Sequence, residues 1–313
     1  MQEAHTLVKL VTLLFLACGC TNPQEGLATG SSPVKIENKN AVRRVDSGKI
    51  RLSLSATDTA KFLHFMSDKK ITERISYKSP DLDTAQVIDT VLISKALTLG
   101  GLSADFEFAK IPNSERERAM VLSGDVTIAG TSQWDWWADE NREAVYKSDV
   151  VVPNGSFEKG LYVKMENLAT FSISSPQDIA KFNCVSNKVW RVDWTTLSGL
   201  GFKNLQSAPN TESMFKMVAG GHADLTVQSF SGLPDMSITL GGITLYPITG
   251  WKVLLNGSRH YVVSKKNAHG AATFEALQKG LAIMRQSDEV VRALTESGFF
   301  NVNVKKWKPI QAE

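Results

Sequence analysis

The sequence predicts an α/β fold made of two lobes of similar size. Its 313 residues suit about two domains of roughly 150 residues each. In both halves of the chain, short strands alternate with amphipathic helical segments. This alternation is typical of parallel or mixed sheets flanked by helices. We therefore expect two α/β lobes, each a mixed or parallel sheet covered by helices.

Composition narrows the class of partner. With 35 Lys and Arg against 32 Asp and Glu, the formal charge is only +3, which lacks the dense basic surface that nucleic acid requires. Hydrophobic residues make up 42% and charged residues 21% of the chain, as in folded globular proteins. We expect no nucleic-acid partner. No zinc spacing occurs among the three Cys and five His, so we also expect no metal and no cofactor.

The N-terminus predicts export and a lipid anchor. The apolar run 10–17 is too short to span a bilayer of roughly 30 Å, and it reads as the core of a signal peptide. It leads into Leu16-Ala17-Cys18-Gly19-Cys20, which resembles a bacterial lipoprotein signal. The resemblance implies a signal peptide at 1–19 and lipidation of Cys20, with Cys18 as the second choice. A plain secretory signal is the alternative.

After the signal, residues 20–48 are polar and lack apolar periodicity, which predicts a flexible tether. The first folded half then follows, and the helix at 114–122 should begin with a capping box of Ser114 and Glu117. Its strands and helices are expected at 49–55, 84–99, 105–111, 114–122 and 126–130.

The second half repeats this pattern, with Thr211 as an expected N-cap and Gly298 as the final helix stop. Cys184 lies in an apolar-flanked strand and is expected to be a small buried hydrophobe. The expected elements lie at 175–179, 184–186, 190–200, 205–208, 211–219, 220–227, 260–264, 272–285 and 288–296.

Three segments together resemble the amino-acid-binding branch of type-2 periplasmic solute-binding proteins, the substrate-binding partners of ABC transporters. The first contains Gly130-Thr131-Ser132, then Glu140-Asn141-Arg142, then Tyr146-Lys147-Ser148-Asp149. The others are 211–224, and 259–265 with 276–298. Their order and spacing carry the resemblance over most of residues 49–300.

The resemblance implies a two-lobed clamp with two crossover strands that closes on a small solute. Lobe 1 would comprise 49–154 plus 256–313, and lobe 2 would comprise 155–255. Ligands of open α/β sheets bind beyond the carboxyl ends of the strands, so the site is expected between the lobes. The chain would be a monomer on the periplasmic side of the cell envelope. Thr21 after Cys20 favours an outer-membrane anchor in a host with two membranes.

In lobe 1, Thr131 and Ser132 follow a strand and are expected to hold a carboxylate or other polar group. Arg142 matches the carboxylate-binding arginine of the family, a task that suits a planar bidentate donor. Its alternative is a solvated helix charge. Three indoles crowd residues 134–137, and Trp134 is expected to face the ligand, with packing in the hinge or core as the alternative.

In lobe 2, Ser186, Asn187, Trp190 and Arg191 lie between a strand and the next helix. The resemblance implies that this segment supplies a second hydrogen-bonding group, and Ser186, Asn187 and Trp190 are expected to contact the ligand. Arg191 and Asp193 form a surface pair in the alternative interpretation. Ser229 stands where the family places an aspartate that pairs with the ligand's ammonium. A hydroxyl cannot compensate that charge, so a standard zwitterionic amino acid is not the expected ligand.

These observations favour a lipid-anchored solute-binding protein that delivers a small polar solute to a membrane permease or sensor protein. Two alternatives stay open. One is a dehydratase-like enzyme on the same fold; we do not favour it because the available Glu140, Asp149 and His222 form no acid–base pair in the sequence. The other is an envelope scaffold that binds a protein partner through its Trp-rich surface.

Overall fold

The computed structural model describes residues 49–102, 105–171 and 173–310. The signal segment 1–19, the lipidation candidates Cys18 and Cys20, and the tether 20–48 lie outside these residues. Within the described ranges, no helix has the length and apolar character needed to cross a membrane.

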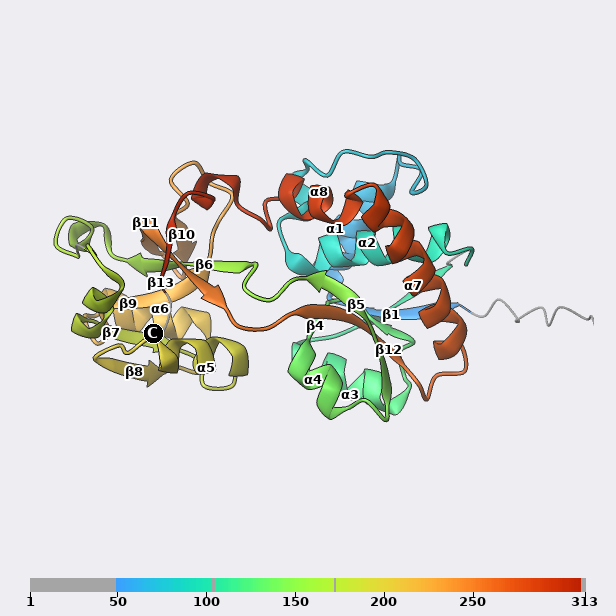
Figure 1. Ribbon diagram of the computed structural model, residues 1–313, viewed down its shortest axis with the longest axis horizontal. Coiled ribbons are helices and arrows are strands. Elements are labelled where there is room, and N and C mark those ends of the chain that lie inside the picture. Colours follow the sequence, from blue (N-terminus) through green and yellow to red (C-terminus); the bar gives the residue numbers. More distant parts are fainter. Residues whose placement is uncertain (1–48, 103–104, 172, 311–313) are drawn as a thin grey trace, which may run out of the picture. The chain divides into compact units, whose positions relative to one another are not determined.

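The first sheet has six strands, and it is mixed (Figure 1). They are β1 (Ile50–Leu54), β2 (Phe106–Lys110), β3 (Ile128–Ala129), β4 (Gln133–Trp134), β5 (Val145–Val152) and β12 (Arg259–Ser264). The order is β2-β1-β3-β12-β4, and β5 also pairs with β12. β1 runs parallel to β2 and β3, whereas β12 runs antiparallel to β3, β4 and β5.

Helices cover both faces of the first sheet because apolar side chains point from each face into a separate core. The helices are α1 (Ala56–Met66), α2 (Ala85–Leu99), α3 (Ser114–Ser123), α4 (Asp135–Glu140), α7 (Gly270–Gln286) and α8 (Glu289–Glu296), with a 3-10 turn at Pro80–Leu82. One core joins the sheet to α1, α2, α7 and α8, and the other joins it to α3 and α4. Figure 1 shows these two groups on opposite sides of the strands.

The second sheet has seven strands and is also mixed. They are β6 (Phe157–Val163), β7 (Asn183–Ser186), β8 (Asn204–Ser207), β9 (Leu225–Ser229), β10 (Ile238–Leu240), β11 (Ile243–Leu255) and β13 (Lys308–Ile310). The order is β10-β11-β6-β9-β7-β8, with β13 on β11. Helix α5 (Arg191–Gly199) and the 3-10 helix Pro176–Lys181 pack on one core of this sheet, and α6 (Thr211–Ala219) packs on the other. Short 3-10 turns also occur at Met165–Asn167 and Val302–Val304.

Two connections carry the chain between the sheets. One joins the end of β5 to the start of β6, and the other joins β11 to β12. The backbone N–H of Gly257 donates to Oδ1 of Asn154 at 2.8 Å, so the two connections are tied side by side. The C-terminus crosses once more: β13 pairs with β11. Residues 308–310 therefore join the second sheet, although the sequence-based boundary assigned all of 256–313 to the first lobe.

The expected two-lobed α/β architecture is confirmed with its two crossovers, to which the C-terminal passage to β13 adds a third. Some local details also differ. The capping side chains are Asn113 for α3 and Asn210 for α6, one residue before the expected Ser114 and Thr211. Helix α1 was not expected, because its first turn is polar and only Asp58, Phe62 and Phe65 of its residues are buried.

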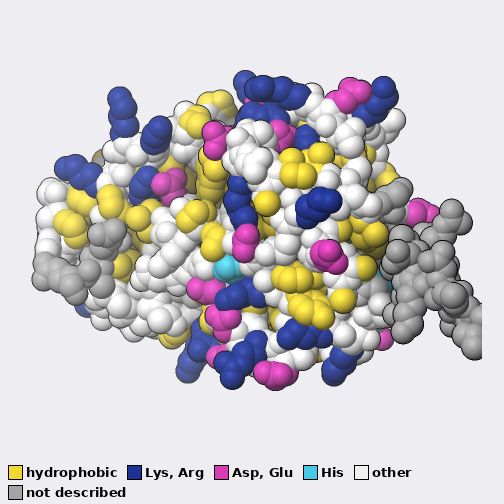
Figure 2. Space-filling model, turned by 45° about the vertical axis from the view of Figure 1, so that its right-hand side comes forward, with side chains coloured by type: hydrophobic (Ala, Val, Ile, Leu, Met, Phe, Trp, Pro, Cys, Tyr) yellow, Lys and Arg dark blue, Asp and Glu magenta, His cyan; other side chains and the backbone are white. Residues whose placement is uncertain are grey.

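Charges are interspersed over the surface. On the face shown in Figure 2, Lys and Arg side chains lie among Asp and Glu side chains, and no single sign dominates that face. Cys184 is fully buried and free, which confirms its expected role as a core residue.

Candidate ligand site

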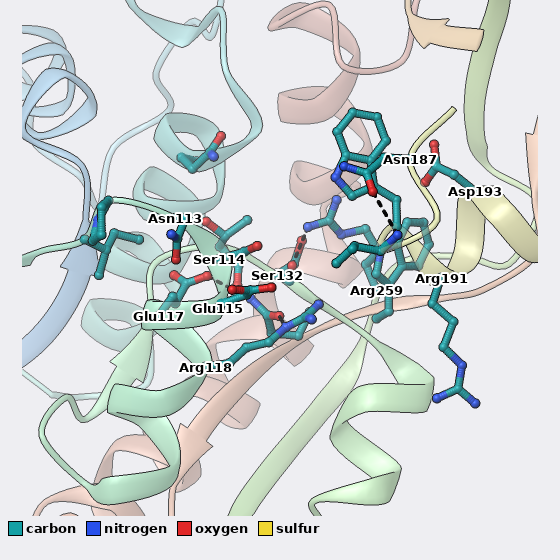
Figure 3. A pocket seen from close by; sticks show the side chains of 18 of the residues that line it. Asn113, Ser114, Glu115, Glu117, Arg118, Ser132, Asn187, Arg191, Asp193 and Arg259 are labelled. Atoms are coloured by element: carbon teal, nitrogen blue, oxygen red, sulfur yellow. Dashed lines mark hydrogen bonds between the residues drawn. The ribbon is translucent and has the colours of Figure 1, made fainter. Parts of the chain in front are cut away.

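A pocket of about 730 Å³ lies between the two lobes. Its lobe 1 wall comes mainly from the segments that follow β1, β2 and β3, and its lobe 2 wall comes from those that follow β7 and β8 (Figure 3). These are parallel strands in each sheet, so their carboxyl ends meet at one edge. Ligands of open α/β sheets bind at that edge, and the volume suits a small molecule.

Five of the eight predicted ligand-binding residues line this pocket. Thr131, Ser132 and Trp134 contribute from the first lobe, and Asn187 and Trp190 contribute from the second. The structure therefore brings together residues that are more than 50 positions apart in sequence.

The other three predicted residues do not line it. The side chain of Arg142 is 82% exposed, and its Nε lies 3.6 Å from Oε1 of Glu143, which is 93% exposed. Helix α4 ends at Glu140, and Arg142 lies in the turn that follows, at the surface. Ser186 is buried in β7, and its hydroxyl has no hydrogen-bond partner among the described residues. Ser229 is exposed at the end of β9.

Two of the predicted polar groups shape the walls. The backbone N–H and the hydroxyl of Ser132 both donate to Oδ2 of Asp89 at 2.8 Å. The amide of Asn187 donates to the carbonyl of Pro209 and accepts from the N–H of Val189. Their side chains are therefore used to fix the loops, and the ligand contacts must come largely from other groups.

Arg259, which is not among the predicted ligand-binding residues, is one of those groups. It reaches the pocket from β12, where it donates from Nη2 to the carbonyl of Ser132 and lies 5.1 Å from the ring centroid of Trp134. Its Nε is buried and has no hydrogen-bond partner in the described part of the chain. Burial lowers the pKa of Arg259, and the attraction of Asp89 only partly opposes this.

Arg118 enters the pocket from α3. Its Nε donates to Oε1 of Gln133 at 3.0 Å, and its guanidinium lies 5.5 Å from the ring centroids of both Trp136 and Trp137. Burial lowers the pKa of Arg118, although Glu117 opposes the shift. Figure 3 shows Arg118 and Arg259 entering the site from different elements, with Ser132 nearby.

Glu117 is the third group that the sequence analysis missed. Its residue is only 1% exposed. Its carboxylate accepts hydrogen bonds from the Ser53 hydroxyl at 2.8 Å and from Nε2 of Gln133 at 2.9 Å. Burial raises the pKa of this carboxyl to about 7. We expected Glu117 to belong to a capping box with Ser114. Asn113 caps the helix instead, and Glu117 lines the pocket.

In the second lobe, Asp193 forms an ion pair with Lys159, and the two side chains are only 9% and 10% exposed. The surface pair of Arg191 with Asp193, the alternative interpretation, does not form. Arg191 instead donates to Oε1 of Glu140 at 2.6 Å and lies 4.3 Å from the ring centroid of Trp136. This contact links α5 of the second lobe to α4 of the first.

The three indoles of residues 134–137 have different environments. Trp134 and Trp136 line the pocket, whereas Trp137 is 6% exposed within the core beneath α3 and α4. Over residues 49–102, 105–171 and 173–310, no group of three or more His, Cys, Asp or Glu side chains is placed to hold a metal ion.

No protein-family model matches the sequence, and no curated protein matches it either. Among solved structures, the chain is similar to a probable amino-acid ABC transporter extracellular-binding protein from Bacillus subtilis. The identity is 16% over 67% of this chain and 88% of that chain, with a TM-score of 0.49.

Two further solved structures are similar at the same level. One is substrate-binding domain 2 of GlnP from Lactococcus lactis in an open conformation, with 12% identity over 79% of this chain and 94% of that chain and a TM-score of 0.47. The other is the periplasmic VFT2 domain of BvgS from Bordetella pertussis, with 15% identity, coverage of 68% and 83%, and a TM-score of 0.46.

The chain's own topology decides the fold. Each lobe has a mixed sheet with helices on both faces, two adjacent connections join the lobes, and the pocket described above lies between them. This is the two-lobed architecture of type-2 periplasmic solute-binding proteins.

Proposed function

We propose that this protein is an extracytoplasmic solute-binding protein that captures a small organic solute between its two lobes. The observation that carries the proposal is the composition of the pocket walls. Aromatic and polar side chains line the pocket from both lobes, with Trp134 and Arg259 on one wall and Trp190 and Arg191 on the other. A few polar groups among aromatic walls are typical of small-molecule sites.

Contact with both lobes explains how binding changes the protein. A ligand shifts a conformational equilibrium only by the contacts that it makes in one state and not in the other. A solute that touches Trp134 and Trp190 together therefore favours the state in which the walls are close. Closure about the two connections between the lobes presents a different outer surface to a membrane permease or a sensor protein, which we propose as the receiver. In this proposal lipidation at Cys20 holds the protein at the membrane.

An enzyme remains the second candidate because of Glu117. A carboxyl group with a pKa near 7 in a pocket suits general acid–base catalysis. Both oxygens of Glu117 already accept hydrogen bonds from the chain, and catalysis requires one of them to be released to a substrate. Turnover of a bound compound that is lost in Glu117→Gln supports the enzyme; binding without turnover supports the binding protein.

The proposed function is tested by a thermal-shift screen of the full chain against amino acids, amines, carboxylates, sugars and phosphorylated metabolites. A ligand at 100 times its Kd stabilises the folded state by about 2.7 kcal/mol, which is a clear shift in Tm. Trp134→Ala and Trp190→Ala should each reduce the shift, and Trp194→Ala, on α5 but outside the pocket, should not. A shift that depends on one lobe alone contradicts capture between the lobes.

A further inference from the structure

The charged side chains that line the pocket differ in how many hydrogen bonds and ion pairs they form with the rest of the chain. Four carboxylates and three guanidinium groups line it. They are Asp58, Glu115, Glu117, Asp193, Arg118, Arg191 and Arg259. The partners of each group decide which charge is left for a ligand.

The acids of the pocket are already engaged or solvated. Asp193 is neutralised by the buried ammonium of Lys159. Glu117 accepts the two hydrogen bonds described above, and Asp58 accepts hydroxyl hydrogen bonds on both of its oxygens. Glu115 is exposed, where water screens its charge. Every buried carboxylate of the described lining is therefore already engaged by groups of the chain, and Asp193 is paired with a cation.

The arginines differ from the acids. Arg191 is engaged by Glu140. Arg118 and Arg259 each donate one hydrogen bond to the chain, to Gln133 and to Ser132 respectively. Their remaining Nη hydrogens find no acceptor among the described residues. The positive charge of Arg259 also contributes to the lowered pKa of Arg118, so the two guanidinium groups repel each other.

We propose that the pocket takes a small organic carboxylate without an ammonium group, and that its oxyanion is held by Arg118 and Arg259. This inference rests on the proposed solute-binding function and specifies its ligand class. A carboxylate supplies the acceptors that the two guanidinium groups lack, in the planar geometry that arginine matches best. It also separates the two positive charges with a negative one.

The rest of the ligand is apolar or aromatic. Trp136 and Trp190 line the pocket beside the arginines, and flat indole surfaces favour an apolar body or a ring. An amino acid with the same carbon skeleton brings an ammonium group into the pocket, where the carboxylate of Asp193 is already paired with Lys159. We therefore expect a carboxylate to bind at least tenfold more tightly than the amino acid of the same skeleton.

The experiment is isothermal titration of the full chain at pH 7 with probes of matched skeleton. The aromatic set is 3-phenylpropionate, phenylalanine and 3-phenylpropylamine, and the dicarboxylate set is glutarate and glutamate; inorganic phosphate tests whether any oxyanion suffices. Arg259→Gln and Arg118→Gln should each weaken carboxylate binding at least tenfold. Arg142→Gln, which removes an exposed arginine outside the pocket, is the matched control and should bind as the wild type does.

The outcomes separate this inference from the function on which it rests. Tighter binding of the carboxylates, lost in the two pocket variants and kept in the control, supports it. If phenylalanine or the amine binds as tightly as 3-phenylpropionate, the carboxylate inference is overturned while solute binding stands. Binding of phosphate in place of the carboxylates also overturns it. No binding in any set overturns the inference, and a silent thermal-shift screen would then overturn the function too.

Discussion

Replacing Lys159 by methionine tests how the second lobe excludes cationic groups. Lys159 and Asp193 form an ion pair at the pocket, and their side chains are 10% and 9% exposed. Methionine keeps much of the apolar stem but removes the charge, so Asp193 is left buried without its cation. Removal of one partner from a buried pair costs about 3–5 kcal/mol. We expect the free energy of unfolding at pH 7 to fall by about that amount.

Urea unfolding of the full chain measures this loss. Lys164→Met is the matched control, because Lys164 and Glu166 form an ion pair whose side chains are 27% and 67% exposed. Such surface pairs contribute about 0–1 kcal/mol. The double variant Lys159→Met/Asp193→Asn should recover most of the loss. If Lys159→Met costs no more than the control, Asp193 is well hydrated without Lys159, and the reasoning that it is unavailable to a ligand fails.

The same variant should change ligand preference. With Lys159 gone, the carboxylate of Asp193 needs a new cation, and an ammonium from a ligand supplies one. Phenylalanine should therefore gain at least tenfold in affinity relative to 3-phenylpropionate, as measured by titration. An unchanged ratio would show that Asp193 does not reach the ligand.

Three further predictions concern pH, packing and reactivity. Burial raises the pKa of Glu117 from 4.5 to about 7, so its contribution to stability is fully present below pH 4.5 and is lost as the pH rises through 7. The difference in free energy of unfolding between wild type and Glu117→Gln, followed by urea unfolding, should shift by about 3 kcal/mol over this range; a constant difference contradicts the raised pKa. A Cβ on Gly280 would lie 1.8 Å from the carbonyl oxygen of Ala96, so Gly280→Ala should push α7 from α2 and cost at least about 1–3 kcal/mol, whereas Lys279→Ala beside it should have little effect on Tm. Burial raises the pKa of the Cys184 thiol, so peptide mass spectrometry should find alkylation at Cys184 only after unfolding; labelling of the native protein would refute its burial.

Much of the fold can be predicted from local sequence patterns. The helical spacing of apolar residues placed α2 at 84–99, and the structure has it at Ala85–Leu99. Strand β1 follows from the strict alternation at 49–55. The helix starts at Asn113 and Asn210 were misplaced by one residue, because each of these asparagines precedes a Ser or Thr that has the same capping chemistry. The C-terminal strand β13 is three residues long, too short for any periodicity to be detected.

The site was predictable only where a local pattern marks it. Thr131 and Ser132 follow a strand, and this position is visible in the sequence. Arg259 is not, because its position depends on the pairing of β12 with β4, which joins segments more than 120 residues apart. Glu117 has an ordinary helix-start explanation in the sequence, and only the contact with Ser53 on β1 shows its burial.

Capture between the lobes is tested most directly by hydrogen-exchange mass spectrometry of the full chain, with and without a saturating ligand from the titrations. If the solute is held by both walls, amides at 130–134 of the first lobe and at 187–193 of the second should slow together, and the same ligand should leave both segments unchanged in Arg259→Gln. Slowing confined to one of the two segments, or to neither, would contradict a ligand-binding clamp.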